Sequence, residues 1–356
     1  MVLTFILGNG FDQAIGMSTS YRDFYQWYKN PASDDSEDVA SMKKEINNYI
    51  RGEDNTWADF EMALGQYTNK FSNKAQFIEV FQHARSALIR YLASQYESIK
   101  TENKDFLKSA TYRLIELSQN ISEKLSEAQR QLFWVGKETN TIFNCISFNY
   151  TPILRDGTQN MKDNAGGISN RDGWYGTYKL GKMINVHGLL DDFPILGVDN
   201  ASQIANESFR DDPDILQLMV KGEIDKKLGR KWRSEAQEII RNSDKIYVYG
   251  ASLGATDEFW WRELALWLEE DPDNHQFALY CHPKTDSRKM NAERDRIVRS
   301  ISKHFTRGDY SANIVIDDKE KTMTVKFAYM SAKVEIKTSV TANPSAVPAI
   351  SLSIER

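Results

Sequence analysis

The chain opens on a continuous apolar run, Val2–Leu7, which ends abruptly at Gly8-Asn9-Gly10. An uninterrupted apolar run of this length is typical of a strand that is buried on both faces of a sheet. The two glycines allow the backbone to turn sharply as it leaves the strand. This feature predicts a sheet core with helices packed against both of its faces.

Further short apolar runs alternate with helical patterns, for example over Trp232–Arg241 and residues 258–269. This alternation predicts parallel pairing with right-handed crossovers. We therefore predict an α/β fold with a Rossmann-like, mostly parallel sheet, built from residues 1–20 and 137–308. The five further predicted strands are residues 141–148, 182–188, 193–198, 245–250 and 275–281.

The block between the first two strands, residues 21–136, has apolar residues at three- and four-residue spacing, and we predict a large helical insertion. The clearest helices are residues 77–96 and 111–133. Thr56 and Asp59 resemble a capping box that opens a helix over residues 57–67.

Two further segments depart from this alternation. Residues 156–181 are rich in Gly, Asn and Asp, lack periodicity, and are predicted to form a long functional or disordered loop. Residues 309–356 alternate at period two, which predicts a β-rich C-terminal extension of hairpins. An exposed strand edge there is a candidate surface for homo-oligomer assembly.

The net charge and the cysteines restrict the class of protein. A formal net charge of −5 over 356 residues argues against a chain that coats nucleic acid or membrane, so nucleic acid is an unlikely partner. Cys145 and Cys281 alone can build neither a disulfide framework nor a structural zinc site. The N-terminal apolar run is too short for a signal peptide or a membrane span. We expect a soluble, cytoplasmic protein with no membrane partner.

Clusters of small and polar residues directly follow four of the predicted strands. In open α/β sheets, ligands bind in the crevice beyond the carboxyl ends of the strands. Each cluster alone is a weak signal, but together they predict a single ligand site at that edge of the sheet. The clusters are residues 8–12, 147–151, 187–188 and 250–257.

The first cluster, with Gly8, Asn9, Gly10 and Asp12, suits a turn that approaches a phosphate closely. The full dinucleotide fingerprint requires a further glycine where this chain has Gln13, so an ordinary dehydrogenase is disfavoured. The alternative is a tight strand-to-helix turn that binds no ligand.

The second and third clusters supply the catalytic candidates. Asn149 can orient a ribose hydroxyl or a water molecule, because its amide both donates and accepts; alternatively it caps the helix that begins near Thr151. His187 is the one histidine at a strand end followed by glycine, which suits a general base. The alternative is a core histidine whose hydrogen bonds are satisfied.

In the fourth cluster, Gly250, Ser252 and Asp257 could bind a ribose, or Asp257 could cap the following helix. Three acids outside the four clusters are weak candidates for metal ligands, namely Asp191, Asp192 and Asp199. Nothing in the sequence fixes their geometry, so no metal is predicted.

Six segments occur in the order expected for a known family: LGNGFDQAIGMSTSYRDF, WADFEMALGQY, SFNYT, VHGLL, ILGVD and YVYGASLGATD. On these segments the chain resembles the bacteriophage abortive-infection AbiH family, over about residues 1 to 261. The resemblance implies a role in phage defence and a possible phage-encoded trigger.

A weaker resemblance links the same motifs to SIR2-like NAD-consuming domains. It implies that Gly8 and Gly10 hold the dinucleotide phosphates, that Asn149 attends the nicotinamide ribose, and that Gly250 and Ser252 lie near the adenosine. It also implies a catalytic role for His187. Two features depart from that pattern. Thr151 stands where an acid is usual, and the chain has no cysteine quartet for the zinc module of protein deacylases.

Together these observations predict a phage-defence protein that binds and hydrolyses NAD or a related nucleotide. Asn149 and His187 are the predicted catalytic residues. One alternative is a non-catalytic nucleotide-sensing module that acts through a partner, and another is a metal-dependent nuclease. Predicted ligand-binding residues are Gly8, Asn9, Gly10, Asp12, Gly250, Ser252 and Asp257, with Asp59, Glu61 and Thr151 as a second tier.

Overall fold

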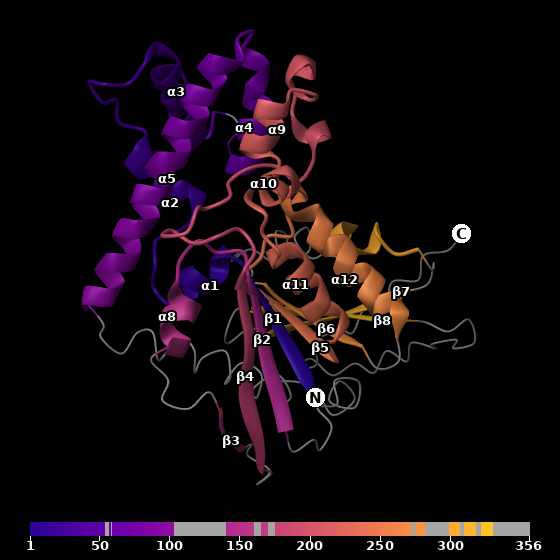
Figure 1. The fold of residues 1–356 in the computed structure, drawn as a ribbon. Coiled ribbons are helices and arrows are strands. Elements are labelled where there is room, and N and C mark those ends of the chain that lie inside the picture. Colours follow the sequence, from indigo (N-terminus) through magenta and orange to yellow (C-terminus); the bar gives the residue numbers. More distant parts are fainter. Residues whose placement is uncertain are drawn as a thin grey trace, which may run out of the picture.

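The computed structural model shows an eight-stranded sheet with helices against both faces and a helical layer above one end (Figure 1). The predicted α/β class is therefore confirmed. The structure describes residues 1–53, 57, 59–102, 140–159, 165–169, 175–271, 275–281, 299–306, 310–317 and 322–329.

Five parallel strands form the centre of the sheet, in the spatial order β4-β2-β1-β5-β6. Numbered along the chain, these five strands read 3-2-1-4-5, so the winding direction reverses between β1 and β5. Such a reversal opens a crevice at the carboxyl ends of the two strands. The strands are β1 (Val2–Leu7), β2 (Asn140–Ser147), β4 (Tyr175–Asn185), β5 (Lys245–Tyr249) and β6 (Gln276–Cys281).

Antiparallel strands complete both edges of the sheet. β3 (Ala165–Ser169) pairs with β4 at one edge. At the other edge β7 (Tyr310–Asp317) and β8 (Thr322–Tyr329) form a hairpin, and β8 pairs with β6. The first of the predicted C-terminal hairpins therefore extends the central sheet. The predicted strands beyond residue 330 lie outside the described residues.

Alternation along β1 explains why both faces of the sheet are covered, because successive side chains of a strand point to opposite sides. Leu3, Phe5 and Leu7 belong to a core with α1 and α8, whereas Ile6 belongs to a core with α11 and α12. These helices are α1 (Asn9–Ala14), α8 (Ile153–Gln159), α11 (Trp232–Arg241) and α12 (Glu258–Glu270). The interpretation of β1 as a strand buried on both faces is thus confirmed.

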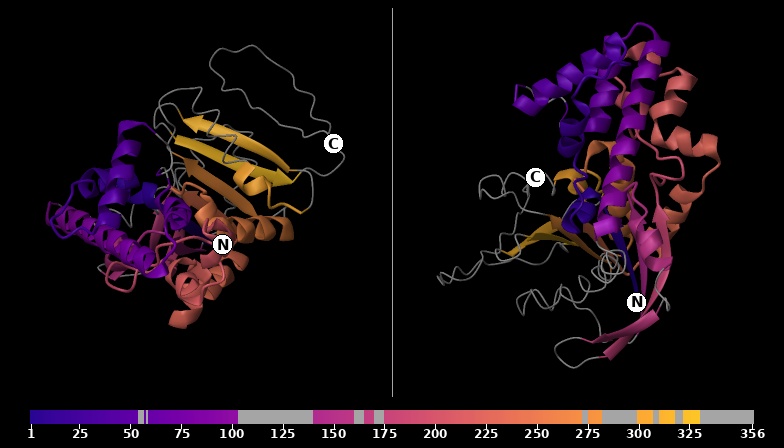
Figure 2. Two further views of the ribbon diagram at one scale, coloured as in Figure 1. Left: turned by 90° about the horizontal axis from the view of Figure 1, so that it is seen from above. Right: turned by 90° about the vertical axis from the view of Figure 1, so that its left-hand side faces the viewer.

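The layer above the sheet combines the predicted insertion with two helices that follow β4 (Figure 2). Its core is aromatic, with Phe24, Tyr25, Trp57 and Phe60 all fully buried. The helices are α2 (Tyr21–Tyr28), α3 (Glu37–Arg51), α4 (Phe60–Tyr67), α5 (Lys74–Glu102), α9 (Pro213–Met219) and α10 (Lys221–Leu228). Short 3-10 helices are η1 (Thr68–Lys70), η2 (Ala201–Gln203), η3 (Glu207–Phe209) and η4 (Ala255–Asp257).

The N-terminus of α4 differs from the sequence interpretation. Asp59 is itself the N-cap and accepts a hydrogen bond from the Met62 amide at 3.1 Å, so the helix begins at Phe60 and not at Trp57. Aspartate is a strong N-cap because its carboxylate satisfies an amide that the helix leaves unpaired. Thr56 and the predicted helix over residues 111–133 lie outside the described residues.

Two predictions about regular structure were wrong. Residues 193–198 are not a strand: Phe193 and Gly197 have φ angles of 41° and 156°, and Pro194 has no amide to donate. The predicted loop over residues 156–181 instead holds the end of α8, β3 and the start of β4. Thr177 pairs there with Asn140, which is a long-range contact that has no local signature.

Cys145 is a buried free thiol on β2, and burial raises its pKa. Cys281 ends β6. None of the helices in the described part of the chain combines the length and the apolar character needed to cross a membrane.

Candidate functional site

The central strands rise toward the helical layer, so their carboxyl ends lie beneath it (Figure 1). The loop after β5 reaches across this edge: Asp257 lies 3.0 Å from His187, which follows β4, although β1 and β2 separate the two strands. Residues from all four predicted clusters therefore meet along this edge.

The glycine turn after β1 packs directly against the turn after β5. The amide of Gly8 donates to the carbonyl of Tyr249 at 2.9 Å, and the amide of Gly10 donates to the carbonyl of Gly250 at 2.8 Å. A Cβ atom on Gly10 would lie 2.6 Å from the Cα of Gly250, so only glycine permits this approach. In this conformation the amides of Gly8 and Gly10, in the turn predicted to approach a phosphate, donate to protein carbonyls.

A hydrogen-bonded carboxyl group lies beside this turn. Asp12, only 2% exposed, accepts hydrogen bonds at 2.6 Å from both the Asn149 amide and the Thr151 hydroxyl. Asn149 also donates to the carbonyl of Gly8 at 3.1 Å. Burial raises the pKa of Asp12 to about 7, although the hydrogen bonds from Thr151 and Asn149 oppose the shift. Near neutral pH this carboxyl group can therefore gain or lose a proton.

A second cluster, here called the charged cluster, consists of Glu61, His187, Lys221 and Asp257. Lys221 is 5% exposed, and its ammonium donates to Glu61 at 2.9 Å, to Asp257 at 2.8 Å and to the Thr256 carbonyl at 3.0 Å. Its members come from α4, the end of β4, α10 and the loop after β5. The charged cluster thus joins the helical layer to the carboxyl edge of the sheet.

The pKa values in the charged cluster follow from burial and from Lys221. Burial alone would raise the pKa of Asp257, but the charges of Lys221 and His187 outweigh it and hold that pKa well below its usual range. Burial would likewise lower the pKa of Lys221, but Asp257 and Glu61 raise it above its usual value. Burial also raises the pKa of Glu61, with Lys221 opposing the shift.

The imidazole of His187 is held between aromatic rings and the charged cluster. Phe148 stacks on it at 5.2 Å between ring centroids, and Tyr150 lies at 6.3 Å. Nε2 lies 3.0 Å from Asp257 Oδ1, although its N–H direction is not aligned as in a full hydrogen bond. Phe148 on its face and the Asp257 carboxylate beside Nε2 therefore fix the position of the ring.

Glu61, named in the second tier from sequence, is held by further contacts. Tyr150 Oη lies 3.2 Å from Glu61 Oε1 and 3.0 Å from the carbonyl of Ile195, and the amide of Gly197 donates to Glu61 at 3.3 Å. Asp59 caps the same helix, where burial raises its pKa. Its carboxylate lies beside Gly254 in the loop after β5.

Not every predicted residue joins these clusters. Asn9 instead binds Thr19, through its amide at 2.7 Å and its carbonyl oxygen at 2.5 Å. Ser252 is exposed. Next to it, Leu253 has a φ of 52°, so the backbone of this loop is strained at a non-glycine residue.

Each of the three acids considered as metal ligands lies beside a different arginine. Asp191 pairs with Arg155 at 2.8 Å, Asp192 with Arg230 at 2.8 Å, and Asp199 lies 3.6 Å from Arg233. Within the ranges that the structure describes, no three His, Cys, Asp or Glu side chains converge as metal ligands.

Sequence reasoning missed Lys221 and Tyr150. Tyr150 lies within the SFNYT segment, next to Asn149, which was a usable signal. Lys221 had no such signal, because its carboxylate partners are 160 and 36 residues away in the chain.

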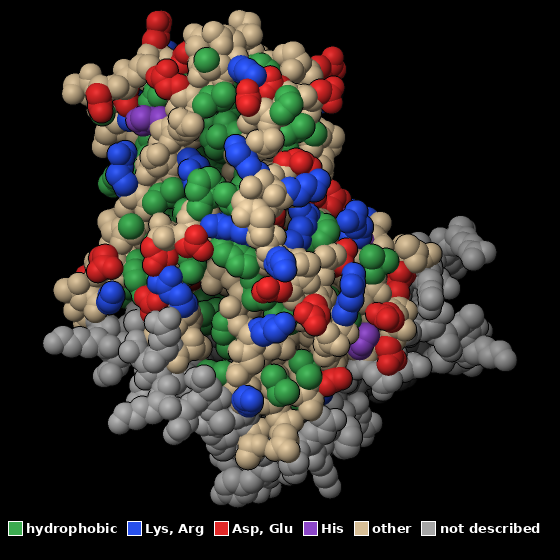
Figure 3. Space-filling model, viewed as in Figure 1, with side chains coloured by type: hydrophobic (Ala, Val, Ile, Leu, Met, Phe, Trp, Pro, Cys, Tyr) green, Lys and Arg blue, Asp and Glu red, His purple; other side chains and the backbone are tan. Residues whose placement is uncertain are grey.

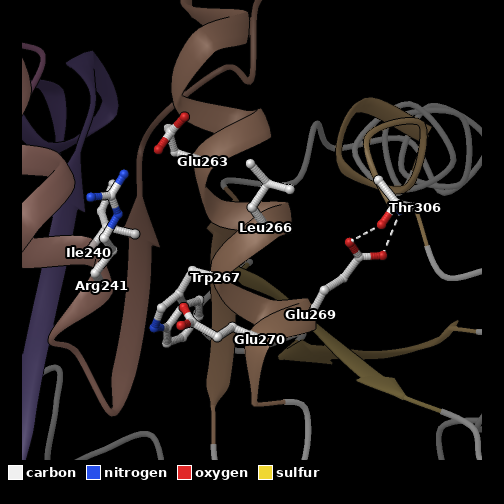
Figure 4. Close-up of a pocket in the computed structure, with 8 residues that line it drawn as sticks. All are labelled: Ile240, Arg241, Glu263, Leu266, Trp267, Glu269, Glu270 and Thr306. Carbon is white, nitrogen blue, oxygen red and sulfur yellow. Dashed lines mark hydrogen bonds between the residues drawn. The ribbon is translucent and has the colours of Figure 1, made fainter.

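A hollow of about 320 Å³ lies elsewhere, between α11 and α12 (Figure 4). Glu269 binds the Thr306 amide and hydroxyl there, at 2.6 and 2.7 Å. Ile240 and Arg241 line it just before β5 begins, so it lies toward the amino ends of the strands. That position disfavours it as the ligand crevice of an α/β sheet.

Comparison with known proteins adds one finding. The family model described as bacteriophage abortive infection AbiH matches residues 4–277, which include both polar clusters at the carboxyl edge. No curated protein and no solved structure matches the chain. Since the family match covers well over half of its 356 residues, this chain belongs to the bacteriophage abortive infection AbiH family.

Proposed function

We propose that this protein is a phage-defence enzyme that binds NAD or a related nucleotide at the carboxyl edge of the sheet and hydrolyses it. Membership of the AbiH family supports the defence role. The parallel strand order, which reverses between β1 and β5, supports a Rossmann-like core of the SIR2-like type and a nucleotide ligand. We assign that core to residues 1–20 and 137–308, with 21–136 as a helical insertion and 309–356 as a C-terminal β extension.

The observation that carries the proposal is the 3.0 Å contact between His187 and Asp257, buried beside Lys221 and Glu61. An imidazole whose one nitrogen faces a carboxylate is arranged as a general base. In the proposed reaction a water molecule attacks C1′ of the ribose as the bond between C1′ and nicotinamide breaks. Nicotinamide leaves as a neutral molecule, and His187 takes the proton of the water.

Asn149 and Asp12 would act on the ribose side of the same site. Asn149 is fixed by two acceptors, Asp12 and the Gly8 carbonyl, so its amide has a defined orientation. Thr151 donates its hydroxyl to Asp12, which brings a carboxyl group next to the position where the SIR2-like pattern has an acid. In the SIR2-like pattern that acid holds the nicotinamide amide, and we propose that Asp12 performs part of this role.

NAD turnover by the purified protein tests this proposal. We expect nicotinamide and ADP-ribose to form in equal amounts, and chromatography measures both products. His187→Ala should lower the rate by about 10²–10⁴-fold, the usual cost of losing a general base. His83→Gln is the matched control, because His83 lies in the helical insertion, where it contacts Tyr28 and Asp35. Each variant must keep the melting temperature of the parent protein.

Asn149→Ala separates binding from chemistry in the same assay. Loss of ribose orientation should lower kcat more than it changes KM. A fully active, folded His187→Ala protein would contradict the catalytic assignment.

A second candidate function is nucleotide sensing without chemistry, and the burial of the two catalytic candidates favours it. His187 and Asn149 are only 5% and 7% exposed, so they are poorly placed to reach a bound nucleotide. Tight NAD binding by calorimetry together with no turnover would support this function over hydrolysis.

A further inference from the structure

A second hollow, of about 590 Å³, lies in the helical layer between α5, α9 and α10. This volume is within the usual range for small-molecule sites. Apolar and basic side chains lie close together on this part of the surface (Figure 3). Its apolar lining includes Ile78, Leu196, Leu218, Ile224 and Leu228.

Two cations line the hollow, and no acid among the described residues pairs with either of them. Arg85, half-buried, donates Nε and Nη2 to the carbonyl of Pro194 at 3.1 and 2.8 Å, and no carboxylate among the described residues pairs with it. Lys227 is exposed and also forms no ion pair within the described ranges. Asp214 is the acid that lines the hollow, and Lys74 already holds it at 2.7 Å. A half-buried guanidinium with free donors favours an anionic ligand.

Phe193 provides an aromatic surface at the same place. The residue is 48% exposed, and the Arg85 guanidinium lies 4.3 Å from the ring centroid. The φ of 41° at Phe193 is unfavourable for a non-glycine residue, and such strain persists where the surrounding structure enforces it, often at ligand sites.

We propose that this hollow binds a small organic anion, namely a phosphate or carboxylate attached to an apolar or aromatic body. Arg85 and Lys227 would hold the anionic group, and Phe193 with the aliphatic lining would contact the body. The proposal does not depend on the reaction at the carboxyl edge. The two sites nevertheless share a wall, because the Ile195 carbonyl lies 3.0 Å from Tyr150 Oη and the Gly197 amide donates to Glu61.

The probe for the test is 1-anilinonaphthalene-8-sulfonate, whose fluorescence rises when its aromatic rings bind an apolar surface. With the full-length protein we expect one saturable site, from which phenyl phosphate and benzoate displace the probe and neutral benzyl alcohol does not. Arg85→Gln should weaken binding by about tenfold or more, as expected when a charge-assisted contact is lost. Lys227→Gln, on an exposed side chain, should weaken binding without any risk to folding.

The matched controls are Arg90→Gln on the same helix as Arg85 and Lys226→Gln beside Lys227, both exposed in the structure. Both controls should bind the probe as the parent protein does, and the melting temperature of every variant checks its folding. The absence of a saturable site, or equal binding by parent and Lys227→Gln, would overturn the proposal. Displacement by benzyl alcohol as effective as by phenyl phosphate would overturn the assignment of an anion.

Discussion

Asp12 and Asp257 follow neighbouring strands, β1 and β5, at the same edge of the sheet, yet their pKa values are shifted in opposite directions. Burial raises the pKa of Asp12 to about 7, since only neutral donors contact its carboxyl group. For Asp257, Lys221 and His187 outweigh burial and lower the pKa. The difference shows that the charges beside a buried aspartate, chiefly that of Lys221 at Asp257, decide whether it is ionised. The site thereby combines a carboxyl group that exchanges protons near neutral pH with one that stays charged.

Replacing Lys221 by a neutral residue should have the largest effect on stability. Lys221→Met leaves Glu61 and Asp257 buried without their shared donor. We expect a loss of about 3–5 kcal/mol in the free energy of unfolding, as for other broken buried ion pairs. Urea denaturation at pH 7.5 measures it.

Lys226→Met is the surface control, since Lys226 pairs with Glu223 in an exposed contact. It should cost about 0–1 kcal/mol. A second test combines Lys221→Met with Glu61→Gln and Asp257→Asn, which should recover much of the loss because no uncompensated charge remains. If Lys221→Met were as mild as Lys226→Met, the cation would not control this cluster.

The next effect concerns Asp12 and depends on pH. A carboxyl group whose pKa is higher in the folded than in the unfolded state destabilises the fold as pH rises from the unfolded pKa, 3.8, to the folded one, about 7. Asp12→Asn mimics the protonated form and removes this penalty. Relative to the parent, the variant should gain on the order of 4 kcal/mol of stability between pH 4 and pH 8.

Denaturation of both proteins at pH 4.5, 6 and 8 checks this expectation. A stability difference that stays constant with pH would show that Asp12 does not change its protonation over this range.

Thr151→Val should have the smallest effect of the three. The Thr151 hydroxyl donates to Asp12 at 2.6 Å and opposes the increase of its pKa. Its loss should cost about 1–3 kcal/mol at pH 8, where Asp12 is ionised, and less at pH 5. Thr158→Val is a suitable control, because the Thr158 hydroxyl bonds only helix carbonyls, those of Leu154 and Arg155. Equal costs for Thr151→Val at both pH values would contradict the assignment.

The parts of the fold that were predictable from sequence are those set by local pattern. The apolar run Val2–Leu7 and the helical spacing of Trp232–Arg241 each produced the expected element, because burial on two faces or on one stripe leaves a direct trace in the sequence. Residues 193–198 are equally apolar but carry Pro194 and a strained Phe193, and they form no strand.

The candidate site divides in the same way. Asn149, His187 and Asp257 were predictable because each follows a strand, and the parallel sheet brings such positions to one edge. The role of Lys221 was not predictable, since it exists only once α10, α4 and the loop after β5 have packed together. The pKa of Asp12 likewise depends on burial that no local pattern reveals.

Direct titration of the two aspartates tests this account most sharply. Carbon-13 NMR of protein labelled at the aspartate carboxyl groups, with Asp12→Asn and Asp257→Asn used for assignment, follows each group from pH 4 to pH 9. We predict that the chemical shift of the Asp12 carboxyl group changes near neutral pH, whereas that of Asp257 stays constant because the group remains ionised throughout. An Asp12 that is ionised at pH 5, or an Asp257 that titrates alongside it, would contradict the claim that neighbouring charge, chiefly that of Lys221, sets the difference.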